Sequence, residues 1–412
     1  MQEVLLHILL NQFGKGRKKL ISLILKKHIR KIELVWLGEK IKEAINLTNK
    51  KIGTWEAIFL VVIIMTNKLI LNLPKRIILS TGSSAWINTI YISIIAILFT
   101  LLLVKLFKRF EGYDILDISH FLGGKYLKIF AGILYIILLV TVPILILRDF
   151  SESLQLIYYK NSPISFILFI FIIGAVFANK FDFKGIVKTN LILVPFLLIS
   201  IIILFFSSAK DFEIQRLFPI LGYGATETFV NGLSNIFSFS IIAYLLFLPP
   251  SLSKVKDFKK ISIISVVISA LYLLIAVVCL LLVFPFIFST NEPISIYLLT
   301  RMIDFGRFFQ RVDALFLLIW MISIFSYISI SLHFLLYVFK KITNITNSKN
   351  MAYCFGAIFF GFSLMPKNIA QFNTFVDIFF KYTVILVIFI ISFLILILAN
   401  FKKKKLESRL DN

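Results

Sequence analysis

The sequence contains few of the residues that enzymes and metal proteins most often use. Of 412 residues, two are cysteine and four are histidine, and 21 acidic residues stand against 44 basic ones. No HExxH, P-loop or GxSxG motif occurs, and no cluster of Cys and His has metal-ligand spacing. We therefore expect no enzymatic activity, no metal and no cofactor. Cys279 and Cys354 lie in apolar runs without CxxC spacing, so we expect two buried thiols and no disulfide.

Apolar residues, in contrast, are abundant. Hydrophobic residues make up 59% of the chain, 45 residues are Phe, and the mean hydropathy is +0.95. A soluble domain of this size could not bury so much apolar surface, whereas a bilayer would solvate it. Ten apolar segments are long enough to cross or nearly cross a membrane. They are residues 55–79, 85–107, 127–147, 164–179, 186–206, 224–248, 261–287, 312–339, 351–366 and 375–400.

The positive charges of the loops alternate along these segments. With ten spans, 32 of the 44 Lys and Arg residues fall on one side of the membrane and 11 on the other, and Lys68 lies within a span. Because positive residues accumulate on the cytoplasmic side, both termini are predicted to be cytoplasmic. The net charge of +23 then reflects contact with anionic membrane lipid, and no nucleic-acid partner is expected.

Three regions follow from this pattern. Residues 1–53 are basic and carry apolar residues at mostly three- and four-residue steps, which predicts an amphipathic cytoplasmic extension on the membrane surface. A tail without a specific role, or an extension from an upstream start codon, would also fit. Residues 54–400 form the predicted ten-helix membrane domain, and residues 401–412 form a basic cytoplasmic tail.

The first predicted span is interrupted by polar residues. Within the stretch AIFLVVIIMTNKLILNLPK, Thr66, Asn67 and Lys68 follow one another in the middle of an apolar run. A Lys at the centre of a membrane helix costs roughly 2.5–3.5 kcal/mol on insertion scales. Either Lys68 extends to the outer headgroups, or the helix is broken at Thr66–Lys68 and lines a binding site.

The sixth predicted span has a similar interruption, in the stretch NGLSNIFSFSIIAYLLFLPP. Its central residues include Ser234, Asn235, Phe237, Ser238, Phe239 and Ser240. Serines also pack membrane helices together, so this pattern alone is a weak signal. Spans one and six, however, are the first members of two five-helix halves, and an odd number of spans inverts the second half. Paired interruptions in such a 5+5 inverted repeat predict a substrate site between broken helices 1 and 6.

Several stretches resemble the spore germination permeases, the B subunits of nutrient germinant receptors. ILILRDFSESL (Ile144–Leu154) closes the third span, RLFPILGYG (Arg216–Gly224) precedes the sixth, and LLFLPPSLSKVKDFKK follows it. FGRFFQRVDALFLLIWMISIFSYISI (Phe305–Ile330) opens the eighth span with an aromatic-Arg-acidic pattern and a Trp seven residues after the Asp. The resemblance covers about residues 52–400. The pairs Arg148/Asp149 and Arg311/Asp313 are interpreted as structural, fixing helix ends.

The resemblance implies an all-α integral membrane protein of the amino acid–polyamine–organocation superfamily, with ten transmembrane helices in a LeuT-like fold. It implies a receptor in the spore inner membrane, a nutrient germinant as ligand, and germinant receptor A and C subunits as partners, the A subunit with large soluble domains and the C subunit a lipoprotein. The alternative function is secondary transport of amino acids or related small solutes.

The chain also departs from the family pattern. Members commonly carry small residues where Thr66, Asn67 and Lys68 stand, and many carry PFGE where this chain has Ser238, Phe239, Ser240 and Ile241. A lysine is gained and an acid lost, so we expect a ligand carboxylate to reach Lys68, or the Lys68 amine to replace a coupling cation. From the flanking third and eighth spans, the resemblance adds Tyr135, Ser326 and Tyr327 to the predicted ligand-binding residues.

Overall fold

The chain divides into two units, Met1–Lys51 and Ile52–Asn412. The computed structural model describes residues 51–70, 73–181, 183–285, 295–302, 312–345, 350–366 and 369–410. Nearly all of the predicted N-terminal extension, residues 1–50, lies outside the described residues, as does Arg311.

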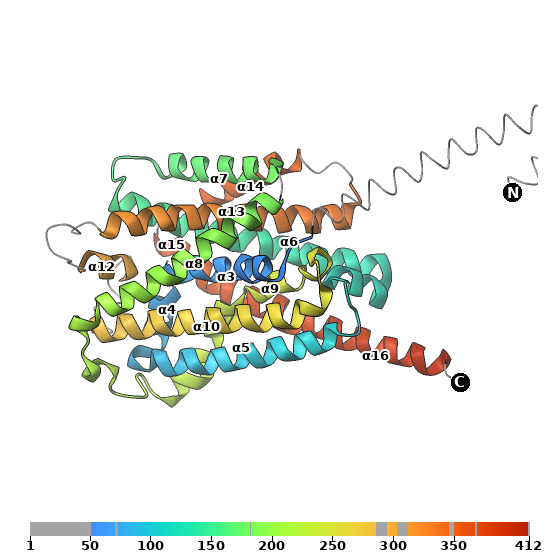
Figure 1. Ribbon diagram of the computed structural model, residues 1–412, viewed down its shortest axis with the longest axis horizontal. Helices are drawn as coiled ribbons and strands as arrows, with labels where there is room; N and C mark the ends of the chain where they lie inside the picture. The colour runs from blue at the N-terminus through green and yellow to red at the C-terminus, as the bar shows by residue number, and fades with distance from the viewer. Residues whose placement is uncertain are drawn as a thin grey trace, which may run out of the picture. The chain divides into compact units, whose positions relative to one another are not determined.

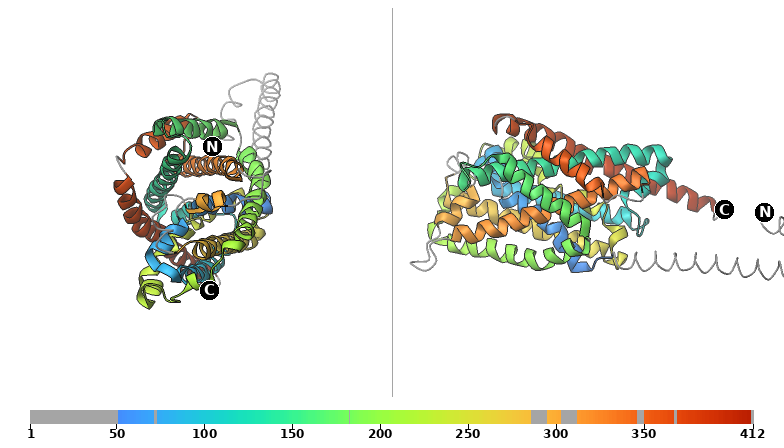
Figure 2. Two further views of the ribbon diagram at one scale, coloured as in Figure 1. Left: turned by 90° about the vertical axis from the view of Figure 1, so that its left-hand side faces the viewer. Right: turned by 90° about the horizontal axis from the view of Figure 1, so that it is seen from above.

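In the first half of the second unit, the helices are α3 (Thr54–Ile70), α4 (Leu73–Thr81), α5 (Ala85–Phe107), α6 (Ile115–Ile157), α7 (Ile164–Phe181) and α8 (Phe183–Ser207). The long helices α5, α6 and α7 run in roughly the same direction, and α8 crosses the bundle obliquely (Figure 1); the left-hand view of Figure 2 looks along the bundle. Most of these helices have few polar residues and are apolar on all sides. Helices that face lipid or other helices have this pattern.

The second half begins with irregular helix. A π-helical turn (Thr226–Val230), a 3₁₀ segment (Asn231–Phe239) and the short α9 (Ile242–Leu245) replace a regular sixth span. The elements that follow are α10 (Phe258–Val283), α12 (Ser295–Met302), α13 (Val312–Thr343), α14 (Met351–Ser363), α15 (Ile369–Ile378), a π-helical segment (Phe379–Ile391) and α16 (Ser392–Leu410). The predicted tail therefore begins as part of α16.

Within the described part of the chain, six helical stretches are long and apolar enough to cross a membrane. They are Leu73–Phe107, Ile115–Ile157, Phe183–Ser207, Val255–Val283, Phe316–Thr343 and Tyr382–Leu406. Two shorter apolar helices, Ile164–Lys180 and Met351–Ser363, accompany them. The expectation of an all-α integral membrane protein is confirmed.

Two predictions about local structure were wrong. Thr66–Lys68 are helical, and the described helix ends at Ile70. Thr66 and Asn67 donate hydrogen bonds to carbonyls four residues earlier, so their polar side chains do not require a break in the helix. Cys279 is buried as expected, but Cys354 is exposed on α14. An apolar run in a membrane protein can face lipid as well as the core, so hydrophobicity alone did not predict burial.

The start of α6 is held by a cluster of charged residues. Asp114 caps the helix by accepting hydrogen bonds from the backbone N–H groups of Leu116 and Asp117, both at 3.0 Å. Burial raises the pKa of the Asp114 carboxyl, against the opposing charge of Lys341 from α13, whose Nζ lies 2.6 Å from it. This cluster joins α6 to α13. Ten residues after Asp114, α6 is interrupted at Gly124, whose φ of 69° with ψ of −158° suits glycine.

The helix α3 lies in the interior and packs against α8, α10 and α13. Its apolar side chains from Leu60 to Met65 are at most 1% exposed. Just before α3, Ile52 pairs with the segment that follows the irregular span: its N–H donates to Ser251 O at 2.9 Å, and its O accepts from Ser253 N at 2.9 Å. Thr54 Oγ1 donates to Asp257 at 2.6 Å, so α3 is tied to the chain that leads into α10.

Gly132 tests the packing of α6 on α13. A Cβ at this position would lie 2.1 Å from Cδ1 of Ile342, whereas a Cβ at Gly361 on α14 would meet nothing within 4 Å. Gly132→Val should therefore lower the free energy of unfolding of the purified protein by about 1–3 kcal/mol, and with it the melting temperature. Gly361→Val should lower neither. Adding Ile342→Ala to Gly132→Val should restore much of the loss. Equal melting temperatures for both single variants would contradict this packing.

Candidate functional site

The polar residues of the first span lie in the last turns of α3. Thr66, Asn67 and Lys68 are 1%, 0% and 6% exposed. Thr66 Oγ1 donates to Val62 O at 3.0 Å within its own helix, so its hydroxyl is directed to the backbone. Asn67 and Lys68 instead reach other elements of the bundle, and they form the centre of the candidate site.

Asn67 joins α3 to α13 through a reciprocal pair of hydrogen bonds. Its Nδ2 donates to Ser323 O at 3.1 Å, and Ser323 Oγ donates back to Asn67 Oδ1 at 3.0 Å. A second bond from Nδ2 to Ile63 O, at 2.9 Å, satisfies the remaining amide donor. Ser326 is buried one turn along α13 from Ser323, on the same face.

Lys68 joins α3 to the irregular sixth span. Its Nζ hydrogen-bonds to Ser240 Oγ, just after the 3₁₀ segment Asn231–Phe239. The alternative in which Lys68 extends to the headgroups is therefore wrong. Among the residues that the structure describes, no carboxylate forms an ion pair with this amine. The polar groups nearest to the amine are the hydroxyl of Ser240 and the carbonyl end of α3.

A second polar cluster lies earlier in the irregular span, centred on Asn235. Asn235 Nδ2 donates to Asn88 Oδ1 at 2.8 Å and to Ser80 Oγ at 2.9 Å. Asn88 Nδ2 in turn donates to Thr228 O at 2.7 Å, and Thr228 Oγ1 lies 2.7 Å from Ser84 Oγ. This cluster connects α4 and α5 to the sixth span, and it is separate from the Lys68–Ser240 pair.

A pocket of about 600 Å³ adjoins the Asn235 cluster. Its lining residues are Leu79, Ser80, Tyr223, Glu227, Asn231 and Ser234. Ser80 both lines the pocket and accepts the hydrogen bond from Asn235, so the pocket reaches the polar cluster directly. From Ser234 to Ser240 the chain advances roughly 12 Å, at about 2 Å per residue in a 3₁₀ helix. The pocket therefore adjoins one end of the segment Ser234–Ser240, and Lys68 contacts the other end.

The other predicted site residues lie in different surroundings. Ser238 and Tyr327 are buried, and their hydroxyls have no hydrogen-bond partner among the described residues. Phe239 is fully buried in the core and Phe237 is half-buried. The hydroxyl of Tyr135 forms a hydrogen bond with Ser392 Oγ on α16, at 2.7 Å. Ser392 belongs to the tenth predicted segment, residues 375–400.

Arg148 pairs with Glu152 on its own helix and also contacts the end of α14. Arg148 Nε and NH2 contact Glu152 Oε1 at 2.7 Å, and NH1 donates to Ser363 O at 3.0 Å. Glu152 lies one helical turn along α6 from Arg148, on the same face of the helix. Arg148 therefore holds the end of α14, which is the structural role expected of it. The side chain of Asp313, like Arg311, lies outside the described residues.

Ser323, Asn88, Ser80 and Thr228 were not predicted from the sequence. Ser323 begins a run of serines at mostly three-residue steps on α13, Ser323, Ser326, Ser329 and Ser331, and this spacing was a usable signal for a polar helix face. Asn88 was the lone amide of the mostly apolar span 85–107. A rare intramembrane amide is expected to face the bundle interior and to have a partner there.

A double-mutant cycle tests the contact between Asn67 and Ser323. Asn67→Leu, Ser323→Ala and the double variant should give a coupling energy of about 0.6–1.7 kcal/mol in the free energy of unfolding, the range found for interhelical hydrogen bonds in membranes. Thr66→Val paired with Ser323→Ala is the control and should show no coupling, because Thr66 bonds within its own helix. Additive effects of Asn67→Leu and Ser323→Ala would exclude this hydrogen bond.

The sequence and fold are similar to those of known proteins. Spore germination protein A2 of Bacillus subtilis (strain 168) is 24% identical over 361 residues, which cover 87% of this chain and 98% of the relative. Spore germination protein YndE of the same organism is 22% identical over 325 residues, covering 77% and 88% of the two chains.

A sodium-coupled sialic acid symporter, solved in a substrate-bound outward-open state, has the same fold. The TM-score is 0.59 at 13% identity, over 82% of this chain and 79% of that chain. The family described as spore germination protein, the spore permeases, matches residues 51–372. With most of its length in that match, the chain belongs to the spore permease family of spore germination membrane proteins.

Proposed function

We propose that the chain is the subunit of a spore germinant receptor that binds a small nutrient, an amino acid by preference, between the first and sixth spans. The observation that carries this proposal is the buried Lys68 amine, which reaches Ser240 of the irregular span and has no carboxylate partner among the described residues. A buried amine carries its positive charge only at a cost when no counter-ion is near, and the carboxylate of a ligand would offset that cost.

The ligand reaches Lys68 from the pocket beside Asn235. The pocket presents hydroxyl, amide and carboxylate groups from Ser80, Asn231 and Glu227, which suit a zwitterionic solute. Glu227 Oε1 accepts a hydrogen bond from Asn231 Nδ2 at 2.8 Å, so this carboxylate is held at the pocket wall. Asn235, Ser238 and Phe237 lie on the irregular span between the pocket and Ser240, and Ser326 and Tyr327 lie on the α13 side.

Irregular backbone makes the sixth span suitable for a conformational switch. Bonds of the i→i−3 type hold Ser240, Ala243 and Tyr244, in place of the regular helical pattern. A ligand that binds one arrangement of this segment better than another shifts the equilibrium between them, and partner subunits can respond to that shift. The germinant receptor A and C subunits are the proposed partners, in the spore inner membrane.

Transport of the same class of solute is the second candidate function. The observation that favours it is the fold shared with a sodium-coupled symporter. In this chain the Lys68 ammonium would occupy the place of a coupling cation. Uptake of labelled amino acids into vesicles that contain the purified chain separates the two, because a receptor binds the solute without accumulating it.

Lys68→Met tests the binding site. In a germinating strain whose own copy is deleted, the variant should accumulate normally, because methionine keeps the apolar stem and removes the charge. The nutrient concentration for half-maximal germination should rise about 10- to 150-fold, because the loss of one hydrogen bond to a charged group weakens binding by about that factor. Nutrients without a carboxylate should be unaffected by the change.

Thr66→Val is the matched control for Lys68→Met. It removes a polar atom from the same helix turn, but that atom bonds only to Val62 O, and the dose–response curve should stay where it is. If Lys68→Met accumulates normally and leaves the whole curve unmoved, Lys68 takes no part in binding.

Ten spans with both termini cytoplasmic are part of the same proposal, and topology labelling tests them. Single cysteines at the N-terminus and at Lys256, with Cys279 and Cys354 replaced by alanine, should react with membrane-impermeant reagents only after the membrane is opened. A cysteine at Asp211, between α8 and the sixth span, should react in intact cells. Labelling of residue 256 from outside would rule out this arrangement.

A further inference from the structure

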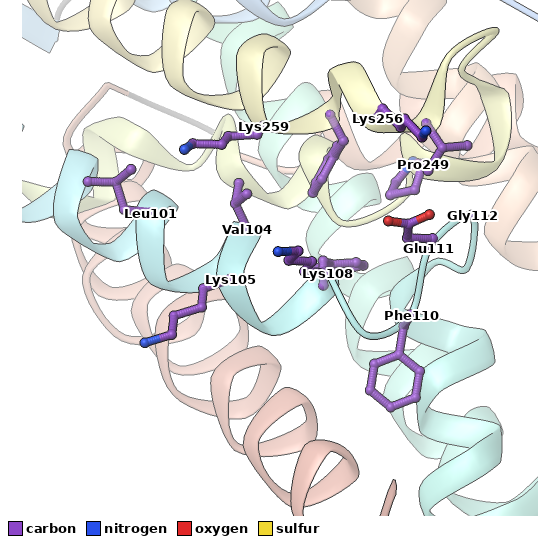
Figure 3. A pocket seen from close by; sticks show the side chains of 13 residues that line it. Leu101, Val104, Lys105, Lys108, Phe110, Glu111, Gly112, Pro249, Lys256 and Lys259 are labelled. Atoms are coloured by element: carbon purple, nitrogen blue, oxygen red, sulfur yellow. The ribbon is translucent and has the colours of Figure 1, made fainter. Parts of the chain in front are cut away.

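A second pocket, of about 580 Å³, lies at the opposite end of α5, where the chain leaves this helix and where α10 begins. Its walls combine apolar and positively charged side chains. Lys105 and Lys108 come from the end of α5, and Lys256 and Lys259 come from the start of α10 and the turn before it. Figure 3 shows these two pairs on opposite sides of the pocket.

The four lysines carry uncompensated charge. All four are exposed, and none forms an ion pair or hydrogen bond with the described residues. Glu111 is the acidic residue of the lining, and it does not pair with them. The lining therefore has a clear positive excess, which attracts an anion and would be relieved by one.

The floor of the pocket is apolar and aromatic. Phe107 and Phe258 are 3% and 6% exposed, and their rings pack with centroids 5.4 Å apart. Such a floor gives no hydrogen bond to a small inorganic anion. It suits a ligand whose charged part meets the lysines while an apolar part lies beside it.

An exposed apolar stripe leads from the pocket along α5. Ile90, Ile94, Leu98 and Leu101 are 38–55% exposed and follow one another at three- and four-residue steps, so they share one helix face. Leu101 also lines the pocket. The stripe is roughly 16 Å long at 1.5 Å per residue, close to the roughly 15 Å of one leaflet of a 30 Å hydrocarbon core.

We propose that this pocket binds the phosphate headgroup of an anionic phospholipid, whose acyl chain lies along the Ile90–Leu101 stripe. The lysines contact the phosphate, and the stripe accounts for the apolar half of the ligand. The chain's own ends do not fit, because both terminal segments are strongly basic and would be repelled. The position in the cytoplasmic leaflet rests on the orientation proposed above, whereas the chemistry of the pocket does not.

The bound headgroup would also contact the segment that ties α3 to the rest of the bundle. Pro249 and Val255 line the pocket, and Leu252 between them pairs with Ile52 immediately before α3. An anionic lipid in this pocket would therefore stabilise the attachment of α3 at this end.

Lipid binding to the purified full-length chain, measured by native mass spectrometry in neutral detergent, tests the proposal. The probes are phosphatidylglycerol, phosphatidylcholine and glycerol 3-phosphate. The variant Lys108→Gln/Lys256→Gln/Lys259→Gln should bind phosphatidylglycerol about 10- to 100-fold more weakly than the original chain, at up to a factor of about five per lysine. Phosphatidylcholine should bind weakly to both.

The matched control is Lys125→Gln/Lys184→Gln/Lys188→Gln, which removes the same charge from residues that do not line the pocket, and it should keep the original affinity. Equal phosphatidylglycerol binding by the original chain and the pocket variant would overturn the proposal. So would an equal loss in the control variant, which would show that only total charge matters. Glycerol 3-phosphate binding as tightly as phosphatidylglycerol would show a site for a soluble phosphate and not for lipid.

Discussion

The buried amine of Lys68 is the constraint on which the arrangement of the inner helices depends. An amine inside an apolar bundle needs a polar partner, and here the partner is Ser240, which follows a 3₁₀ segment. The amine also lies at the carbonyl end of α3, where the helix dipole favours positive charge. The end of one span and the irregular part of another are thereby held together.

The contacts around this pair show why α3 has a defined position. Asn67, next to Lys68, exchanges hydrogen bonds with Ser323 on α13. At its other end, α3 begins beside Ile52, which pairs with the chain just after the sixth span. Both ends of α3 are thus attached to the sixth span or its continuation, so a ligand that moves Ser240 would act on α3 as well.

The sequence predicted the all-α membrane class, because this depends on the hydrophobicity of long segments. It also located the polar trio Thr66–Lys68, whose Asn67 and Lys68 contact other elements of the bundle. It did not predict where the helix ends, since whether Thr66 and Asn67 break a helix or bond to its carbonyls depends on neighbours. Ser323 and Asn88 were missed for the same reason: their partners lie more than 100 residues away in the sequence. The prediction that Cys354 is buried was wrong because lipid-facing and core-facing residues are equally apolar.

The most direct test of the account is to restore the charge at position 68 by chemistry. In a chain with Lys68→Cys and with Cys279 and Cys354 replaced by alanine, 2-bromoethylamine converts the cysteine to a lysine-like side chain, and iodoacetamide adds a neutral group. Binding of amino acids would be followed by thermal shift of the purified protein. The account predicts that the amine reagent alone restores stabilisation by carboxylate-bearing ligands. Equal restoration by the neutral reagent, or full binding before any modification, would contradict it.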